Sequence, residues 1–142
     1  MSETVSLDVE LKSPIERVWH ALTDAATLSK WMWFETDNFQ PVVGHKFQFR
    51  GKESTGWTLV VDSEVLEADK PHRLSFTWVA PGLSGQQSST VVTLTLTEAE
   101  NGVTRLHLEQ SGFADEATRE IGGAKYGWQH QLEQLQNLLA AE

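Results

Sequence analysis

The chain has 142 residues, the size of one ordinary domain, and a formal charge of −9 from 20 acidic and 11 basic residues. It contains no cysteine, which excludes disulfide bonds, thiolate metal sites and a cysteine nucleophile. The acidic charge disfavours nucleic acid as a partner. The sequence shows neither a secretory signal nor an apolar run near the ~20 residues of a membrane span. We therefore expect one cytoplasmic domain over residues 1–142.

The start of the chain predicts a strand and then a short helix. Residues 5–11 alternate strictly between apolar and polar side chains, as in a half-buried strand. Ser13 is suited to cap the helix, with Pro14 at the first helical position. Glu16 then completes a capping box.

A second short helix is expected just before a run of four large apolar residues. Thr23 or Asp24 can cap this helix. The run at 31–34 (Trp, Met, Trp, Phe) cannot face one core with all four side chains, so at least one should lie near a cavity mouth. It could close the end of the sheet as a plug, or form an aromatic lip that contacts a ligand or a partner.

The middle of the chain predicts five strands of an antiparallel meander. Apolar residues alternate with serine, threonine and arginine, so one face of the sheet is dry and the other is wet. Polar turns separate the strands, with a flexible loop at 81–89 and a strong hairpin signal at Asn101-Gly102. The predicted strands cover residues 45–50, 57–66, 74–78, 92–97 and 105–109.

The last quarter predicts one long helix, from about residue 116 to 141, with Asp115 as a plausible cap. Trp128, Leu132 and Leu135 belong to its apolar stripe, which repeats in steps of three and four residues. This helix is the only predicted element long enough to cover the dry face of the sheet. The resulting order, β-α-α-β-β-β-β-β-α, predicts an α+β helix-grip fold in which a curved antiparallel sheet surrounds the C-terminal helix.

Four motifs, spread along the chain, carry a family resemblance. They are SPIERVWHALTDAATLSKWM at 13–32, RLSFTW at 73–78, NGVTRLHLEQSGF at 101–113 and GWQHQLEQLQNLL at 127–139. Together they resemble the Hsp90-ATPase-activator-homologue (AHSA1-like) family of the SRPBCC superfamily, also called START-like or Bet v 1-like. The resemblance covers essentially the whole chain and implies a deep cavity between the sheet and the long helix, usually for an apolar ligand. Members of the superfamily include lipid carriers, hormone-binding proteins, polyketide cyclases and aromatase-like enzymes.

Six tryptophans and six phenylalanines fit either a filled core or an aromatic pocket, and the resemblance favours the pocket. We predict that a small hydrophobic ligand, lipid-like or aromatic and polyketide-like, binds there without a cofactor or a metal. Ser63, Gln110 and Gln131 could orient its polar head group, and Gly127 could leave room for it beside Trp128. The predicted ligand-binding residues are Trp31, Trp33, Phe47, Phe49, Trp57, Leu59, Val61, Ser63, Phe76, Trp78, Leu94, Leu96, Leu106, Leu108, Gln110, Phe113, Trp128, Gln131, Leu132 and Leu135.

Two other functions stay open. The family name points to a chaperone partner, which residues 31–34 or the acidic face could dock. A cyclase or hydrolase would need a carboxylate in the cavity, and a bulge in the strand at 57–66 could turn Glu64 or Glu67 inward. The histidines show no metal-ligand spacing, and His107 is expected to face outward in a polar row across the strands.

Overall fold

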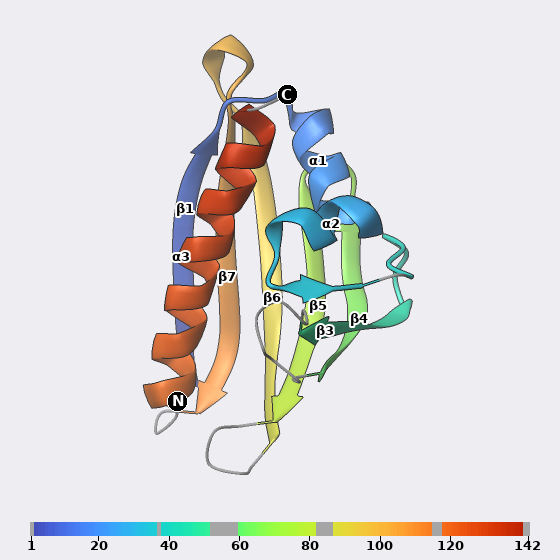
Figure 1. Cartoon of the computed structure of the whole chain (residues 1–142), viewed down its shortest axis with the longest axis vertical. Helices are drawn as coiled ribbons and strands as arrows, with labels where there is room; N and C mark the ends of the chain where they lie inside the picture. The colour runs from blue at the N-terminus through green and yellow to red at the C-terminus, as the bar shows by residue number, and fades with distance from the viewer. Residues whose placement is uncertain (1, 37, 52–59, 82–86, 115–117, 141–142) are drawn as a thin grey trace.

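The computed structural model describes residues 2–36, 38–51, 60–81, 87–114 and 118–140, and over them it shows a seven-stranded antiparallel sheet with three α-helices (Figure 1). The strands are β1 (Ser2–Leu11), β2 (Phe34–Glu35), β3 (Lys46–Gly51), β4 (Val60–Asp69), β5 (Arg73–Pro81), β6 (Gln87–Glu98) and β7 (Thr104–Ala114). The helices are α1 (Ile15–Thr23), α2 (Ala25–Trp31) and α3 (Thr118–Ala140).

The order of the strands in the sheet is β1-β7-β6-β5-β4-β3-β2. Six consecutive strands form a meander, and β1 joins its far edge by pairing with β7. The predicted helix-grip fold is confirmed, with one addition, because β2 was not foreseen. This strand has two residues, which is too short for alternation to reveal it.

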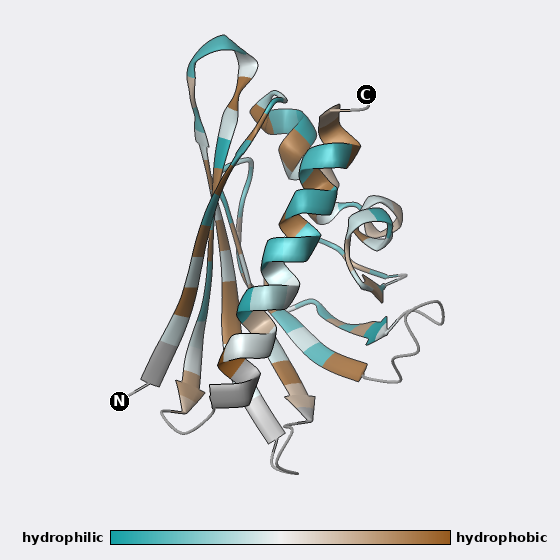
Figure 2. Cartoon of the chain, turned by 60° about the vertical axis from the view of Figure 1, so that its left-hand side comes forward, coloured by the Kyte–Doolittle hydropathy of each residue, from teal (hydrophilic) through white to brown (hydrophobic). Residues whose placement is uncertain are grey.

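All three helices lie on one side of the sheet (Figure 1). The long helix α3 runs along β1 and β7, while α1 and α2 lie over the half that contains β4 and β5. A hydrogen bond from Gln136 Nε2 to the carbonyl oxygen of Glu10, 3.0 Å long, fixes α3 to the edge strand. Hydrophilic residues predominate on the outer side of α3 (Figure 2). No helix in the described ranges is both long and apolar enough to cross a membrane.

The inner face of the sheet is the one that alternation predicted. Val61 and Val65 on β4 are fully buried, as is Leu108 on β7, while Asp62 and Glu64 on β4 point outward. On the helix side, Leu132 and Leu135 are buried as well. The predicted pairing of dry faces is therefore confirmed.

The start of α1 differs from the prediction. Pro14 stands at the cap position with extended backbone angles, and its helix begins at Ile15. Ser13 does not cap the helix, because its hydroxyl is buried without a hydrogen-bond partner. The capping box with Glu16 was therefore wrong.

The start of α2 follows one of the two predicted alternatives. Asp24 Oδ2 accepts hydrogen bonds from the Thr27 hydroxyl, 2.7 Å, and from the Thr27 amide, 3.0 Å. These two bonds also hold the pKa of the Asp24 carboxyl below its ordinary value.

Two predicted turns have different outcomes. Asn101 and Gly102 both adopt positive φ, 62° and 73°, as expected for a tight turn between β6 and β7. The predicted loop at 81–89 was too long, because Pro81 already pairs with Gln87 and residues 87–89 belong to β6. The predicted helix cap at Asp115 lies outside the described residues.

Candidate functional site

Trp78 on β5 stands at the centre of an aromatic cluster on the inner face of the sheet. Its ring centroid lies 5.3 Å from the rings of Phe34 and Phe49, and 5.7 Å from that of Trp128 on α3. The three neighbouring rings are buried, whereas Trp78 keeps part of its surface exposed. Trp78 is therefore the partly exposed member of this cluster.

The cluster continues along β3. Phe47 lies 5.2 Å from Phe49 and 5.9 Å from Phe76, measured between ring centroids. Phe39, in the connection before β3, packs edge-on against Phe47 at 4.8 Å. Phe39 was not predicted, because it belongs to no alternating or helical pattern in the sequence. These rings form one continuous aromatic wall.

A buried polar network joins α3 to the sheet. The indole Nε1 of Trp128 donates to Gln110 Oε1, and Gln110 Nε2 donates to Thr90 Oγ1, both at 2.8 Å. The Thr90 hydroxyl in turn donates to the carbonyl oxygen of Trp78 at 3.2 Å. Gln110 is thus engaged within the protein. Thr90 was missed, although it continues the two-residue period of Val92.

Gln131 is engaged in the same manner. Its Oε1 accepts the backbone N–H of Trp33 at 2.9 Å, and its Nε2 donates to the carbonyl oxygen of Gly127 at 3.1 Å. A Cβ on Gly127 would stand 3.3 Å from Cζ3 of Trp33. The space that Gly127 leaves is therefore filled by the indole of Trp33.

The run at 31–34 divides into three buried residues and one at the surface. Trp31, Met32 and Phe34 are all at most 4% exposed. The indole Nε1 of Trp31 donates to the carbonyl oxygen of Ala21 at 2.9 Å, so Trp31 belongs to the core and does not form a lip. Trp33 is the partly exposed member of the run.

Trp33 packs against two aromatic side chains of α3. Its ring centroid is 5.4 Å from that of His130 and 6.1 Å from that of Tyr126. Tyr126 stacks in turn on His130 and is 65% exposed. We call Trp33, Tyr126 and His130 the aromatic rim, because Trp33 packs against the core and Tyr126 lies at the surface.

Ser63 is the predicted polar residue that stays without a partner. It lies on the inner face of β4 at 5% exposure, and its hydroxyl makes no hydrogen bond. Its cross-strand neighbour on β3 is Phe47. The register that pairs Asp62 with Val79 places Trp78 opposite it on β5.

The remaining predicted residues either are buried or lie outside the described part of the chain. Trp57 and Leu59 are among the residues that the structure does not describe. The predicted residues that are buried in the core or beside it are Val61, Leu94, Leu96, Leu106, Leu108, Phe113, Leu132 and Leu135.

The two candidate carboxylates do not enter the described interior. A bulge does occur between Val65 and Glu67, as the catalytic alternative required. However, Glu67 forms an ion pair with Arg73, 2.8 Å between Oε1 and Nε, in which both side chains are nearly half exposed. Glu64 lines an open hollow of about 550 Å³ on the outer face. The buried polar side chains in the described ranges are all neutral.

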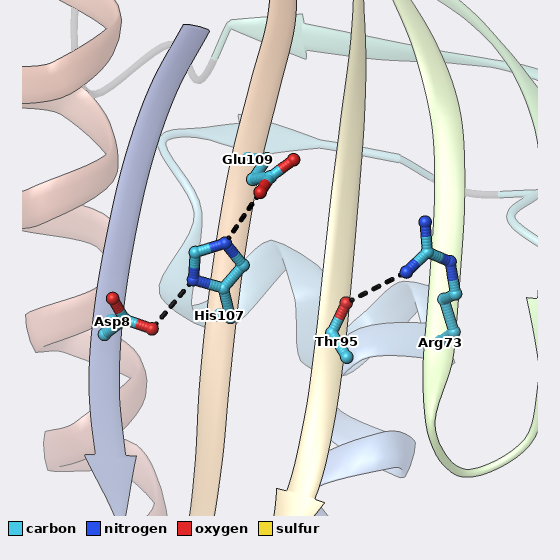
Figure 3. A network of polar contacts seen from close by, with 5 residues as sticks. All are labelled: Asp8, Arg73, Thr95, His107 and Glu109. Carbon is cyan, nitrogen blue, oxygen red and sulfur yellow. Dashed lines mark hydrogen bonds and ion pairs between the residues drawn. The ribbon is translucent and has the colours of Figure 1, made fainter.

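The outer face carries the predicted polar row. His107 on β7 contacts Asp8 on β1 through Nδ1, 2.7 Å, and Glu109 through Nε2, 2.9 Å (Figure 3). The hydrogen bonds with Glu109 and Asp8 raise the pKa of His107 above its ordinary value. The same row continues to β6 and β5, where Arg73 reaches Thr95 at 3.5 Å.

The sequence profile of the family described as activator of Hsp90 ATPase homolog 1-like protein matches residues 12–140. Among curated proteins, none matches the sequence.

Solved structures show the same fold. Protein MLL2253 from Mesorhizobium loti is 37% identical, with a TM-score of 0.86 over 98% of each chain. Protein CV1439 from Chromobacterium violaceum is 26% identical, with a TM-score of 0.80 over 96% of each chain. DynU16, from the dynemicin biosynthetic locus, is 24% identical, with a TM-score of 0.78 over 96% of this chain and 47% of its own. This last likeness concerns the fold alone.

Proposed function

Because the chain belongs to the family of activator of Hsp90 ATPase homolog 1-like proteins, within the SRPBCC superfamily, we propose that it binds a small hydrophobic ligand between its sheet and α3. The fold is that of a ligand-binding domain in general. The observation that supports the proposal is that Trp78, a partly exposed residue, packs among three buried aromatic rings. An apolar ligand that covers this ring gains roughly 25 cal/mol for each Å² removed from water.

The polar groups around Trp78 support an apolar ligand. Gln110 and Gln131, which could hold a head group, already bond within the protein. A ligand that displaced these bonds would leave buried groups unpaired, at a cost of about 1–3 kcal/mol each. Apolar contact is therefore the main source of affinity.

The same hydrogen bonds make the site largely preformed. Gln110 holds the indole of Trp128, and Gln131 holds the backbone of Trp33 at the aromatic rim. The first bond joins β7 to α3, and the second joins the connection between α2 and β2 to α3. A preformed wall lowers the entropy lost when a ligand binds.

A fluorescence titration tests the proposal. We expect a saturable change in tryptophan emission with 2-naphthol or with palmitate, the two probes of the aromatic and lipid classes. Trp78→Leu should weaken that binding about tenfold or more, because it removes the exposed part of the wall. His107→Gln, on the outer face of the same sheet, serves as the control and should bind as the wild type does. Absence of saturable binding with both probes would refute the proposal, as would equal affinity in Trp78→Leu.

A second candidate, docking of an Hsp90-type chaperone, is favoured by the aromatic rim. Tyr126 and His130 are exposed beside the partly exposed Trp33, and interfaces are enriched in aromatic rings such as those of Tyr126 and Trp33. Calorimetric titration with Hsp90 would test it, using Tyr126→Ser and Trp33→Ala. We expect both variants to weaken docking if the rim is the contact, while Tyr126→Ser should leave 2-naphthol binding unchanged. If both variants bind Hsp90 as tightly as the wild type does, the aromatic rim is excluded as the contact surface.

A further inference from the structure

The hydroxyl of Ser63 is unusual for a group on the inner face of a sheet. It is buried at 5% exposure, between the core residues Val61 and Val65 on β4, and it has no hydrogen-bond partner. A buried hydroxyl in this condition lowers the stability of the fold. Polar groups left unpaired in this manner often have a role in binding or catalysis.

The position of Ser63 connects it to the proposed ligand site. Phe47 is its cross-strand neighbour on one side. On the other side, the register of β4 and β5 places Trp78 opposite it. Residues directly opposite on antiparallel strands have Cβ atoms about 4.5–5.5 Å apart. The register therefore places Ser63 beside Trp78, the partly exposed residue on which the ligand is proposed to bind.

Other polar groups near this wall are already satisfied. Thr90, Gln110 and Gln131 each make hydrogen bonds within the protein. The hydroxyls of Ser13 and Thr36 are also buried without partners, but they lie in the connections that follow β1 and β2, outside the sheet. Among the described residues, Ser63 is thus the unpaired polar group of the inner face.

We propose that Ser63 is the polar anchor of the site and that the ligand is a neutral aromatic molecule with a phenolic hydroxyl or an aryl carbonyl. This inference rests on the proposed function. A serine hydroxyl both donates and accepts, so it can pair with either oxygen. The flat ring of such a ligand packs against Trp78 and its aromatic neighbours.

The same surroundings argue against a fatty acid. None of the buried polar side chains in the described ranges is cationic or titratable. A buried carboxylate without a charged partner is strongly disfavoured. A neutral oxygen needs one hydrogen bond, which Ser63 supplies.

The test compares palmitate with two aromatic probes of nearly equal size, 2-naphthol and 2-methylnaphthalene, which carry a hydroxyl and a methyl group at the same position. We expect wild-type protein to bind 2-naphthol more tightly than palmitate. Ser63→Ala should weaken 2-naphthol binding about tenfold and leave 2-methylnaphthalene unchanged, as loss of one hydrogen bond predicts. Ser75→Ala is the matched control, because Ser75 is buried on the outer face of β5 and bonds Thr93. It should change neither affinity.

The outcomes separate the anchor from the function. If Ser63→Ala changes the affinity for both aromatic probes equally, or for neither, the proposed role of Ser63 is refuted while ligand binding stands. Tighter binding of palmitate than of 2-naphthol overturns the ligand class. If the wild type binds none of the three probes, the proposed function and the anchor both fall. Ser63→Cys keeps the size of the side chain and bonds weakly, so it reports the same loss should Ser63→Ala not fold.

Discussion

The indole Nε1 of Trp128 donates a 2.8 Å hydrogen bond to Oε1 of Gln110, and each residue is only 3% exposed. This bond joins the long helix α3 to β7, the strand beneath it. It also orients the ring of Trp128 toward Trp78, 5.7 Å away between centroids. The aromatic wall of the proposed site therefore depends on a buried polar contact.

Replacing Gln110 by Met, which has a similar volume, should destabilise the protein by about 2 kcal/mol. The substitution leaves the buried indole N–H of Trp128 without a partner, which costs about 1–3 kcal/mol. Urea unfolding measures the difference. In the double variant with Trp128→Phe, the loss should be smaller than the sum of the two single losses, because the two residues share one bond. Additive losses would show that the contact is not energetically coupled.

Two glycines of α3 should respond differently to alanine. A Cβ on Gly123 meets nothing within 4 Å, so Gly123→Ala should raise the free energy of unfolding by about 0.5–1 kcal/mol through helix propensity. A Cβ on Gly127 would stand 3.3 Å from the Trp33 ring, so part of that gain is lost as the indole shifts. Urea unfolding and the emission wavelength of Trp33 check both effects. An equal gain at the two positions would contradict the packing of Trp33 on Gly127.

The serines of β4 and β5 should differ in stability as well as in binding. Ser63→Ala removes an unpaired buried hydroxyl, so we expect unchanged or increased stability. Ser75→Ala breaks a 3.1 Å hydrogen bond to Thr93 and should cost about 1 kcal/mol. Thermal unfolding of both variants provides the comparison. A marked loss of stability in Ser63→Ala would mean that its hydroxyl has a structural partner.

His107 should make the stability of the β1 edge depend on pH. Its pKa is raised in the folded protein by hydrogen bonds to Glu109 and Asp8. The stabilisation is therefore complete below the pKa of an unfolded histidine, about 6.5, and is lost as pH rises through the higher folded pKa. Exposed pairs of this kind contribute roughly 0.2–1 kcal/mol.

NMR titration of the histidine ring protons would give the pKa directly, and His107→Gln supplies the control for unfolding at pH 5.5 and 8.5. The free energy of unfolding of the wild type should exceed that of the variant at pH 5.5, and the difference should disappear at pH 8.5. A folded pKa at or below that of free histidine would contradict the contacts with Asp8 and Glu109.

The sequence alone predicted most of the architecture, because its strands and long helix have clear periods. The two-residue period placed Phe76 and Trp78 on the inner face, and the helical period placed Leu132 and Leu135 on the buried side of α3. The signals that failed were local. Ser13 looked like a cap, but it is buried where β1 turns into α1, so Pro14 takes the cap position.

The site itself was only partly predictable. Whether Gln110 and Gln131 face a ligand or a protein partner depends on contacts between distant segments, and Gln131 bonds a residue 98 positions away. Composition could not distinguish these cases. Trp31 and Trp33 are two residues apart in the run at 31–34, yet the indole of Trp31 bonds Ala21 while that of Trp33 packs on His130 of α3. No period in the sequence separates them.

The most direct test of ligand binding is the set of tryptophan indole resonances in a ¹⁵N–¹H spectrum, recorded during titration with 2-naphthol. The account predicts that the resonances of Trp78 and Trp128, assigned through Trp78→Phe and Trp128→Phe, shift saturably with one common affinity. The indole resonance of Trp19, which is buried on α1, should not shift. A spectrum in which Trp78 and Trp128 do not move, or in which Trp19 moves as far as they do, would contradict a site between the sheet and α3.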